Sequence, residues 1–565
     1  MTKEKYIELM EKISFAYSNE DLFDYFSSVK ETGITEHGFP RIVANIGILI
    51  SHGKRMDLYD FFIEIMDFCC ADFLRLKKRA QGNDFSVKEI IFCIMELEKS
   101  NAVSKEKIVF WKSLLAKINY KECYNSYAET EEACPHNWAL FTAVSEFMRE
   151  HIHVAETCEF VDIQIATQLK RLDENKMYRD FHFSKTNPIV YDIVPRGLMA
   201  VLMHFGYNGK FKNEIDGVLR KAGLLTLDMQ SVSGELPYGG RSNQFLHNES
   251  QVALILEYEA DRYYKEGNFE LAGRFKRGAS KAVADIEKWL ARDVITHVKN
   301  NYPLETEIGC EGYAYFNKYM IGAASFLYVA YLFCNDSIVS VETDDEPKAF
   351  SLSKQFNKTF LKNKKFFVEI DEDADLRYDS KGIGRIHFKG APSPLCLSMP
   401  GTATPNYKVG TEENVDFSFA PGVMNEEEIL FATRENAEYI LKDLKTETDG
   451  AYVRYDCHFS NWKTVSFGCE INNDCVTIKV DSNKEKCLML PVFYSDGLLK
   501  SEIKLSANTL EVYYGGWICR YKSQSQILPL GKRGVNKNGE YDLFYTVSDK
   551  EICVQIEFQK VCQRD

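Results

Sequence analysis

The chain has 565 residues, a formal net charge of -14 at pH 7, 45% hydrophobic residues and 27% charged residues. This length allows two or three domains with a large core, and the composition is that of an ordinary globular protein. The acidic balance argues against a nucleic-acid-binding protein, because no basic excess is available to neutralise phosphates. A local arginine or histidine could still bind an anionic substrate.

The first residues, MTKEKYIELMEKISFAY, form a charged amphipathic start without the apolar core of a signal peptide. No apolar run reaches the roughly 18 residues that a membrane span needs. The 16 cysteines include no CxxC pair, so zinc-ribbon and redox motifs have no support. We therefore expect a cytoplasmic protein with reduced thiols, no membrane partner and no cofactor; the sequence leaves a homo-oligomer open.

Residues 1–335 predict a succession of helices. Apolar residues recur at three- and four-residue spacing, as in Ile48, Leu49, Leu58, Phe61, Phe62 and Ile65. Short polar separators such as Gly82-Asn83-Asp84 and Gly267-Asn268 divide the helical segments. The pattern is typical of stacked helical hairpins, although it contains no clean sequence repeat.

Two segments of this region place polar and aromatic groups at helix entries. They are Asn137-Trp138 and the run from Met177 to Arg196. In that run, Tyr191, Asp192 and Arg196 could all reach the same centre. Ordinary loop and capping residues are the preferred interpretation of both segments.

The run from Gly234 to Gln251, GELPYGGRSNQFLHNESQ, is the densest polar segment of the chain. It holds three glycines, an arginine, four amide side chains, a histidine and two glutamates, and the residues from Val252 to Tyr264 predict a buried helix. Burying so many polar groups without partners would cost roughly 1–3 kcal/mol each. A polar ligand in a cleft, most naturally a sugar, explains the segment.

Ser242 or Asn243 is a good N-cap for that helix. A helix that starts there places Asn243, His247 and Gln251 on one face, and Gln244 and Asn248 on an adjacent row. With Arg241 just before the helix, the cluster suits recognition of a carboxylate or of hydroxyls. For His247 alone, a satisfied core histidine would be the better interpretation; the whole cluster favours a functional site.

A second dense segment, from Asn300 to Tyr319, reads NNYPLETEIGCEGYAYFNKY. Its glycines and proline predict a loop that leads into a helix starting near Tyr313. The segment carries carboxylates and phenols, namely Glu305, Glu307, Glu311, Tyr302, Tyr313 and Tyr315. A solvated acidic loop followed by core tyrosines is the competing interpretation.

The character of the sequence changes near Asn335. The acidic stretch from Val341 to Pro347 is a plausible linker, and short alternating runs follow it. They are separated by turn signals such as Asp449-Gly450 and Gly515-Gly516, which predict antiparallel sheet. We thus expect a helical domain over residues 1–335, a linker over 336–355 and a β-domain over 356–565.

Other chemistries have little support. The chain contains no GxSxG, HExxH or P-loop, and no GxGxxG after a strand. His387 and His458 lie in strand-like runs, where single histidines are usually structural. They could hold a metal between sheets, but no spacing demands one.

The helical hairpins, the Gly-rich entry into an Asn/His-bearing helix, the later tyrosine-rich segment and the β-domain resemble the heparinase II/III-like and alginate-lyase-like polysaccharide lyases. The related toroid glucuronyl hydrolases and β-glucuronidases are similar. The resemblance covers most of the chain in architecture and about residues 190–330 in motif. It implies an (α/α) toroid followed by an antiparallel β-sandwich, and a uronic-acid-containing oligosaccharide as substrate.

In a lyase of this type, an Asn or His neutralises the uronate carboxylate and a Tyr moves the protons. The resemblance then implies His247 or Asn243 as the neutraliser. Tyr302 fits by its distance along the chain, whereas Tyr313 and Tyr315 fit by their helix-entry context. His458 is the candidate second histidine. Hydrogen bonds placed where enolate charge develops could lower the barrier by roughly 3 kcal/mol or more.

A hydrolase would instead use two carboxylates as acid and base or nucleophile. Glu249 and Glu311 are then the natural pair, with Glu307 and Glu235 in reserve. A non-catalytic glycan-binding protein is the third alternative. In all three, the expected substrate contacts are Arg241, Asn243, Gln244, Asn248, Tyr238, Tyr315, Tyr191 and His458.

Overall fold

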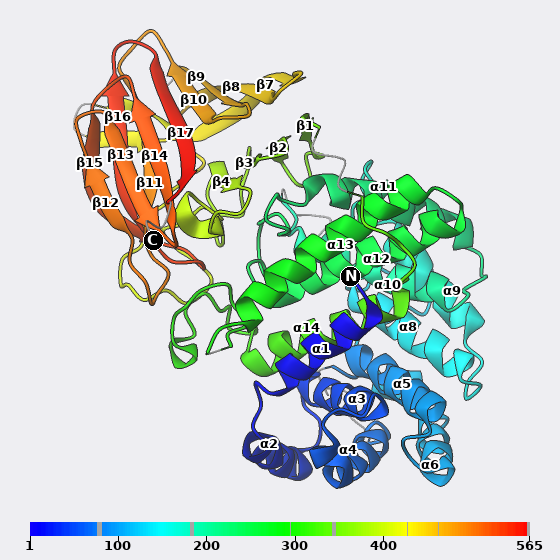
Figure 1. Cartoon of the computed structure of the whole chain (residues 1–565). Helices are drawn as coiled ribbons and strands as arrows, with labels where there is room; N and C mark the ends of the chain where they lie inside the picture. The colour runs from blue at the N-terminus through cyan, green and yellow to red at the C-terminus, as the bar shows by residue number, and fades with distance from the viewer. Residues whose placement is uncertain are drawn as a thin grey trace.

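A computed structural model describes residues 1–75, 82–180, 186–293, 295–341, 346–425, 428–460 and 463–561. Figure 1 shows helices in the first part of the chain and antiparallel sheets in the second, which confirms the expected fold class. The helices are α1 Lys3–Ser14, α2 Asn19–Thr32, α3 Gly38–Ser51, α4 Tyr59–Asp72, α5 Asn83–Ser100, α6 Lys105–Leu115, α7 Tyr120–Cys123, α8 Trp138–His151, α9 Cys158–Leu169, α10 Val190–His204, α11 Lys212–Met229, α12 Leu246–Lys265, α13 Phe269–Leu290 and α14 Phe316–Phe333.

Six of these helices form a closed inner ring. Each packs against the next in the order α3, α5, α8, α10, α12 and α14, and α14 packs back against α3. A hydrogen bond of 3.1 Å from Asn45 Nδ2 to Ser325 Oγ joins this closing pair. Helices α1, α4, α9, α11 and α13 pack on the outside of the ring. The helical hairpins expected from the sequence therefore close into an (α/α) toroid.

The helices differ in how their N-termini are capped. Helices α1, α2, α6 and α13 start with a Thr, Ser or Asn whose side chain accepts a hydrogen bond from the first turn. Such caps satisfy backbone N–H groups that have no partner within the helix. None of the six inner helices is capped by its own N-cap side chain. At the inner helices other groups take this part, as when Leu246 N donates to His297 O and Gly38 N donates to Glu36 Oε2.

The β-domain has three antiparallel sheets in the described residues. The first contains β1 Lys348–Ser351, β2 Lys358–Lys362, β3 Phe366–Asp371 and β4 Gly382–Phe388 in that order. The eight-stranded sheet has the order β12-β13-β14-β17-β10-β9-β8-β7, and the five-stranded sheet the order β15-β16-β11-β5-β6. Their strands are β5 Pro421–Asn425, β6 Glu428–Phe431, β7 Ala437–Thr446, β8 Ala451–Phe459, β9 Thr464–Ile471, β10 Val476–Asp481, β11 Lys486–Ser495, β12 Glu502–Leu505, β13 Thr509–Tyr514, β14 Trp517–Ser523, β15 Ile527–Val535, β16 Glu540–Ser548 and β17 Ile552–Lys560.

The four-stranded sheet connects the two hydrophobic cores. On β3, Phe367 belongs to the helical core, whereas its neighbours Phe366 and Val368 belong to the β-domain core. Successive residues of a strand point to opposite faces, so this sheet lies between the toroid and the sandwich. The sandwich core itself combines residues of both larger sheets, such as Val453 and Leu488.

The connection between the two regions is shorter than the sequence indicates. Helix α14 ends at Phe333 and β1 begins at Lys348, inside the expected linker of residues 336–355, because β1 pairs with β2. Within the acidic stretch from Val341 to Pro347, residues 342–345 lie outside the described residues.

No helix in the described part of the chain is both long enough and apolar enough to cross a bilayer.

Close packing between α3 and its neighbours generates a stability prediction. A Cβ on Gly47 would lie 2.3 Å from Cys93 Sγ and 2.6 Å from the Phe62 ring. We expect Gly47→Ala to lower the free energy of unfolding by about 1–3 kcal/mol through overpacking. Gly217 is the matched control, because a Cβ there meets nothing within 4 Å on α11. Gly217→Ala should stabilise the helix by roughly 0.5–1 kcal/mol. Denaturant titration of both variants checks this prediction, and equal effects would contradict it.

Candidate functional site

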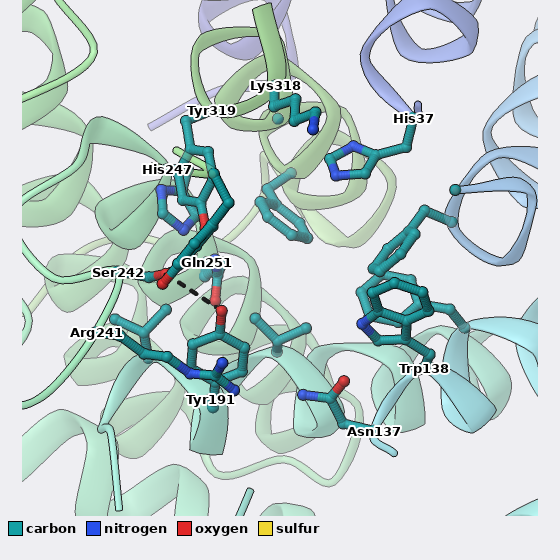
Figure 2. Close-up of a pocket in the computed structure, with 18 of the residues that line it drawn as sticks. His37, Asn137, Trp138, Tyr191, Arg241, Ser242, His247, Gln251, Lys318 and Tyr319 are labelled. Atoms are coloured by element: carbon teal, nitrogen blue, oxygen red, sulfur yellow. Dashed lines mark hydrogen bonds between the residues drawn. The ribbon is translucent and has the colours of Figure 1, made fainter. Parts of the chain in front are cut away.

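A cavity of about 580 Å³ opens at the N-terminal ends of the inner helices. Each of the six helices contributes lining residues from its N-cap or first two turns. The polar and aromatic lining residues, several of which are labelled in Figure 2, are Glu36, His37, Arg41, Phe85, His136, Asn137, Trp138, Phe141, Asp180, Tyr191, Arg241, Ser242, His247, Gln251, Tyr313, Lys318, Tyr319 and Phe326. The positive ends of six helix dipoles therefore point towards this space, which favours a negatively charged ligand.

Three phenols converge on one serine in the wall of the cavity. The Ser242 hydroxyl lies 3.2 Å from the Tyr191 hydroxyl, 3.0 Å from that of Tyr313 and 2.9 Å from that of Tyr319. Burial raises the pKa of Tyr313 and of Tyr319, and the neighbouring phenol of Tyr191 raises both further. These two tyrosines are consequently protonated near neutral pH and available as proton donors.

His247 and Gln251 lie beside the phenols on the first turns of α12. The His247 ring packs edge-on against Tyr319, with ring centroids 4.6 Å apart. Its Nδ1 and both amide atoms of Gln251 are buried without a hydrogen-bond partner in the described residues. Burial, together with the charge of Arg41, holds the pKa of His247 well below its ordinary value, so the imidazole is neutral. Buried polar atoms normally have partners, so these three atoms mark a place for a ligand.

Charged groups surround this cluster. Arg41, Arg241 and Lys318 line the cavity together with Glu36 and Asp180. Arg241 pairs with Asp180 and stacks on Tyr191, with 4.2 Å from its guanidinium carbon to the ring centroid. The cavity therefore carries a small cationic excess in addition to the helix dipoles.

An aromatic wall faces the tyrosine cluster across the cavity (Figure 2). Trp138 packs edge-on against Phe85, and Phe85 packs against Phe141, with centroid distances of 4.9 Å and 4.3 Å. Flat apolar rings opposite a polar cluster suit a ligand that has one apolar face and several hydroxyl groups.

The loop from Gly234 to Phe245 presents Arg241 and Ser242 to the cavity and is held by the β-domain. Gly240 N donates to Asp379 Oδ2 at 2.6 Å, Lys537 Nζ donates to Asn243 O at 3.1 Å, and Asn538 Nδ2 donates to Gln244 Oε1 at 3.1 Å. The site therefore requires both domains.

The start of α12 corrects the sequence-based prediction. The helix begins at Leu246, not at Ser242 or Asn243, because Ser242 and Gln244 adopt left-handed backbone angles with φ of 61° and 63°. Asn243 precedes the helix, so it does not share a helical face with His247 and Gln251. The second helix likewise begins later than expected, at Phe316 instead of near Tyr313.

Four of the expected substrate contacts are buried and do not line the cavity. The Asn243 amide donates to Gly240 O, and the Gln244 amide oxygen accepts from Asn538. Asn248 lies within the first turn of α12. The Tyr238 ring lies under Lys358 Nζ, which is 3.6 Å from its centroid. The loop folds these side chains inward, where they support its shape.

The expected carboxylate pair is also absent from the cavity. Glu249 belongs to a buried ion cluster in which Lys299 Nζ lies 2.8 Å from Glu249, 2.9 Å from Asp285 and 3.5 Å from Glu235. Glu311 accepts from Ser242 N at 2.7 Å and from Lys537 Nζ at 2.6 Å. Both glutamates sit behind the loop and hold it.

Three further candidates lie elsewhere. The Tyr302 hydroxyl donates to Glu540 of the β-domain at 3.3 Å. Tyr315 is 52% exposed and lines a different cavity. His458 is an exposed residue of β8 that contacts Thr464, and it does not approach the toroid cavity. Tyr191, Arg241, His247, Gln251 and Tyr313 are predicted residues that the structure brings together.

Several residues of the cavity were not predicted from the sequence. Arg41 and His37 come from the start of α3, and Tyr319 and Lys318 from α14. A polar segment before an apolar helix, the pattern that marks Arg241 and His247, also occurs at Thr35-Glu36-His37 and could have indicated the start of α3. Asn137-Trp138, expected to be ordinary loop and capping residues, lines the cavity.

No protein-family model and no curated protein sequence matches the chain. Solved structures do share its fold, which is that of the (α/α)-toroid polysaccharide lyases. A Paenibacillus xanthan lyase superposes with a TM-score of 0.52 at 10% identity, over 93% of this chain and 53% of that chain. The chain thus spans about half the length of the xanthan lyase.

Two other structures superpose less closely. A mutant of the heparan sulfate lyase HepC from Pedobacter heparinus gives a TM-score of 0.48 at 9% identity, over 93% of this chain and 76% of that chain. A chondroitin AC lyase from Streptomyces coelicolor A3 gives 0.45 at 10% identity, over 98% and 79%. The helices and sheets of the chain itself confirm the expected architecture, a toroid followed by a β-sandwich.

The buried ion cluster behind the loop yields a second prediction. Replacing Lys299 with Met leaves Glu235, Glu249 and Asp285 without their shared cation. We expect a loss of about 3–5 kcal/mol in the free energy of unfolding. Lys210→Met, which removes one exposed pair with Glu131, should cost less than about 1 kcal/mol. Urea titration measures the free energy of unfolding of both variants. A loss in Lys299→Met no larger than that in Lys210→Met would contradict a stabilising role of the buried ion cluster.

Proposed function

We propose that the protein cleaves uronic-acid-containing oligosaccharides by β-elimination in the toroid cavity. The observation that carries this proposal is the combination of a neutral, unpartnered His247, an unpartnered Gln251 and the three phenols gathered on Ser242. Elimination needs one proton acceptor, one proton donor and a site for the carboxylate, and this cluster contains candidates for each.

The carboxylate of the substrate is the group that needs neutralising, because the adjacent C5 hydrogen is barely acidic. The inner-helix N-termini, the Gln251 amide and the cationic groups Arg41 and Lys318 offer donors and positive potential in the same cavity. Such groups stabilise the enolate charge that develops in the transition state. The Trp138 wall would support the opposite face of the sugar.

His247 is the candidate base, because its imidazole is neutral. It takes the C5 proton, the C5–H electron pair forms the C4–C5 double bond, and the C4–O bond breaks. Tyr313 or Tyr319 gives its proton to the departing oxygen, since both phenols are held in the protonated form. The proton on His247 then returns to the phenolate, with no net change in the enzyme.

Hydrolysis and simple binding remain as alternatives. The Glu249 and Glu311 pair does not line the cavity. The carboxylates that do line it are Glu36, which pairs with Lys318, and Asp180, which pairs with Arg241. These engagements favour elimination over acid–base hydrolysis by a carboxylate pair. A glycan-binding protein would use the same contacts without forming product.

Turnover distinguishes these alternatives. Incubation with glucuronate- and iduronate-containing oligosaccharides should raise near-ultraviolet absorbance, and the fragment masses should sum to the starting mass. Fragments that gain one water without absorbance would establish hydrolysis instead. Binding without any product would establish a glycan-binding protein.

Substitutions test the residue roles. Tyr313→Phe, Tyr319→Phe and His247→Ala each remove a proposed proton carrier, and we expect at least one tyrosine variant and the histidine variant to lose about 10²- to 10⁴-fold in kcat. Tyr264→Phe is the matched control, because Tyr264 lies at the other end of α12 and lines neither this cavity nor the second one, and the activity of this variant should be unchanged. Full activity in both tyrosine variants would remove the phenols from the mechanism.

The pH profile tests the state of His247. The ordinary pKa of histidine is 6.5, and the pKa of His247 lies well below it. His247 therefore stays unprotonated as the pH falls through 6.5, and its capacity to act as a base is lost only below its own pKa. We therefore expect kcat/KM, which reports groups of the free enzyme, to have its acidic limb well below pH 6.5. A limb centred near 6.5 would contradict a buried, neutral His247.

A further inference from the structure

A second cavity of about 860 Å³ lies on the other side of the Glu311–Tyr319 segment. Its walls come from residues 304–317 of the helical domain and 405–408 of the β-domain. Two backbone hydrogen bonds hold these walls together, from Gly309 N to Lys408 O at 2.8 Å and from Lys408 N to Cys310 O at 2.9 Å. The lining is therefore a built part of the fold.

Three buried polar atoms in this wall have no hydrogen-bond partner in the described residues. They are His297 Nδ1, Glu311 Oε2 and the Tyr407 hydroxyl. The three residues are only 2%, 2% and 5% exposed. Leaving such atoms unpaired costs about 1–3 kcal/mol each, so three in a single cavity point to a ligand that pairs with them.

The hydrogen-bonding character of these atoms defines the ligand. His297 Nε2 lies 2.8 Å from the Ala314 carbonyl, which can only accept, so Nε2 carries the proton and Nδ1 is an acceptor. Burial lowers the pKa of His297 to about 4 and keeps this neutral form. Glu311 Oε2 is also an acceptor, while the Tyr407 hydroxyl can donate or accept. The wall is therefore complementary to a ligand with several hydrogen-bond donors.

The charge at the mouth of the second cavity restricts the charge of the ligand. Glu305, Glu307 and Glu311 line the cavity. Lys408 pairs with Glu307 at 3.3 Å, and Lys537 pairs with Glu311 at 2.6 Å. With these two pairs balanced, the exposed carboxylate of Glu305 leaves a negative charge at the mouth, which opposes an anionic sugar, in contrast to the toroid cavity.

We propose that this second cavity binds a neutral or amine-bearing sugar unit, whose hydroxyl or ammonium groups donate to His297, Glu311 and Tyr407. It is separate from the proposed elimination site, but the two share a wall. Glu311 Oε1 accepts from the backbone N–H of Ser242 at 2.7 Å, on the residue that gathers the phenols.

Cys310 provides a local reporter for this binding, because its half-buried thiol lines the second cavity. The experiment measures alkylation of each cysteine by peptide mapping, with glucosamine, glucose or glucuronate present. At about ten times its Kd, glucosamine should slow alkylation of Cys310 about tenfold, since only unoccupied protein reacts. The exposed thiols of Cys134 and Cys158 are internal controls and should react at unchanged rates.

Tyr407→Phe tests the contact directly. The hydroxyl has no partner in the described residues, so the variant should fold normally, while the Kd for glucosamine rises about two- to tenfold through one lost hydrogen bond. Tyr17→Phe, which removes a buried hydroxyl that lines neither cavity, should leave the Kd unchanged.

Three results would overturn the proposal: protection by glucuronate equal to that by glucosamine, no protection by any of the sugars, or an unchanged Kd in Tyr407→Phe. The readout is independent of catalysis. Protection of Cys310 in a protein that cleaves no uronide would remove the proposed elimination and keep this site.

Discussion

The parallel arrangement of the six inner helices is the constraint on which the site depends. Each helix brings backbone N–H groups and about half a positive charge to its N-terminus. None of the six is capped by its own N-cap side chain, so these N–H groups take partners from other parts of the chain. Gly38 N donates to Glu36 Oε2, for example, and Leu246 N donates to His297 O. The six helix dipoles in addition favour an anion in the cavity.

The β-domain positions the loop of the toroid cavity, although the described lining residues all belong to the helical domain. Its contribution is a set of fixed donors and acceptors: Asp379 holds Gly240, Asn538 holds Gln244, and Lys537 ties Asn243 to Glu311. Glu311 in turn orients the backbone of Ser242. The phenol cluster is therefore placed by an ion pair between residues that lie more than two hundred positions apart.

Local patterns predicted the fold and part of the site. Apolar spacing and turn chemistry identified helices and strands because both depend on nearby residues, and polar density before a buried helix found Arg241, His247, Tyr191 and Tyr313. Arg41 was not predicted because it is ordinary in its own segment and becomes notable only when the ring closes. Tyr319 ends the tyrosine-rich segment, but the spacing alone does not show which of its phenols faces the cavity. Tyr302 and Glu249 do not line the cavity, because partners distant in sequence hold them: the Tyr302 hydroxyl donates to Glu540 of the β-domain, and Glu249 pairs with Lys299. Neither partner can be read from the local pattern.

Closure of the ring by α14 against α3 also constrains the order in which the molecule is made. During synthesis, α3 is translated early, and it can pack against α14 only after the chain has been made past Phe316. Lys537 and Asn538, which hold Glu311 and Gln244, are translated later still. The earlier inner helices meet their sequence neighbours first, whereas these distant contacts must wait for loop closure over hundreds of residues. The cavity is consequently among the last features to form, and a nascent chain carries the separate parts of the site before it can bind anything there.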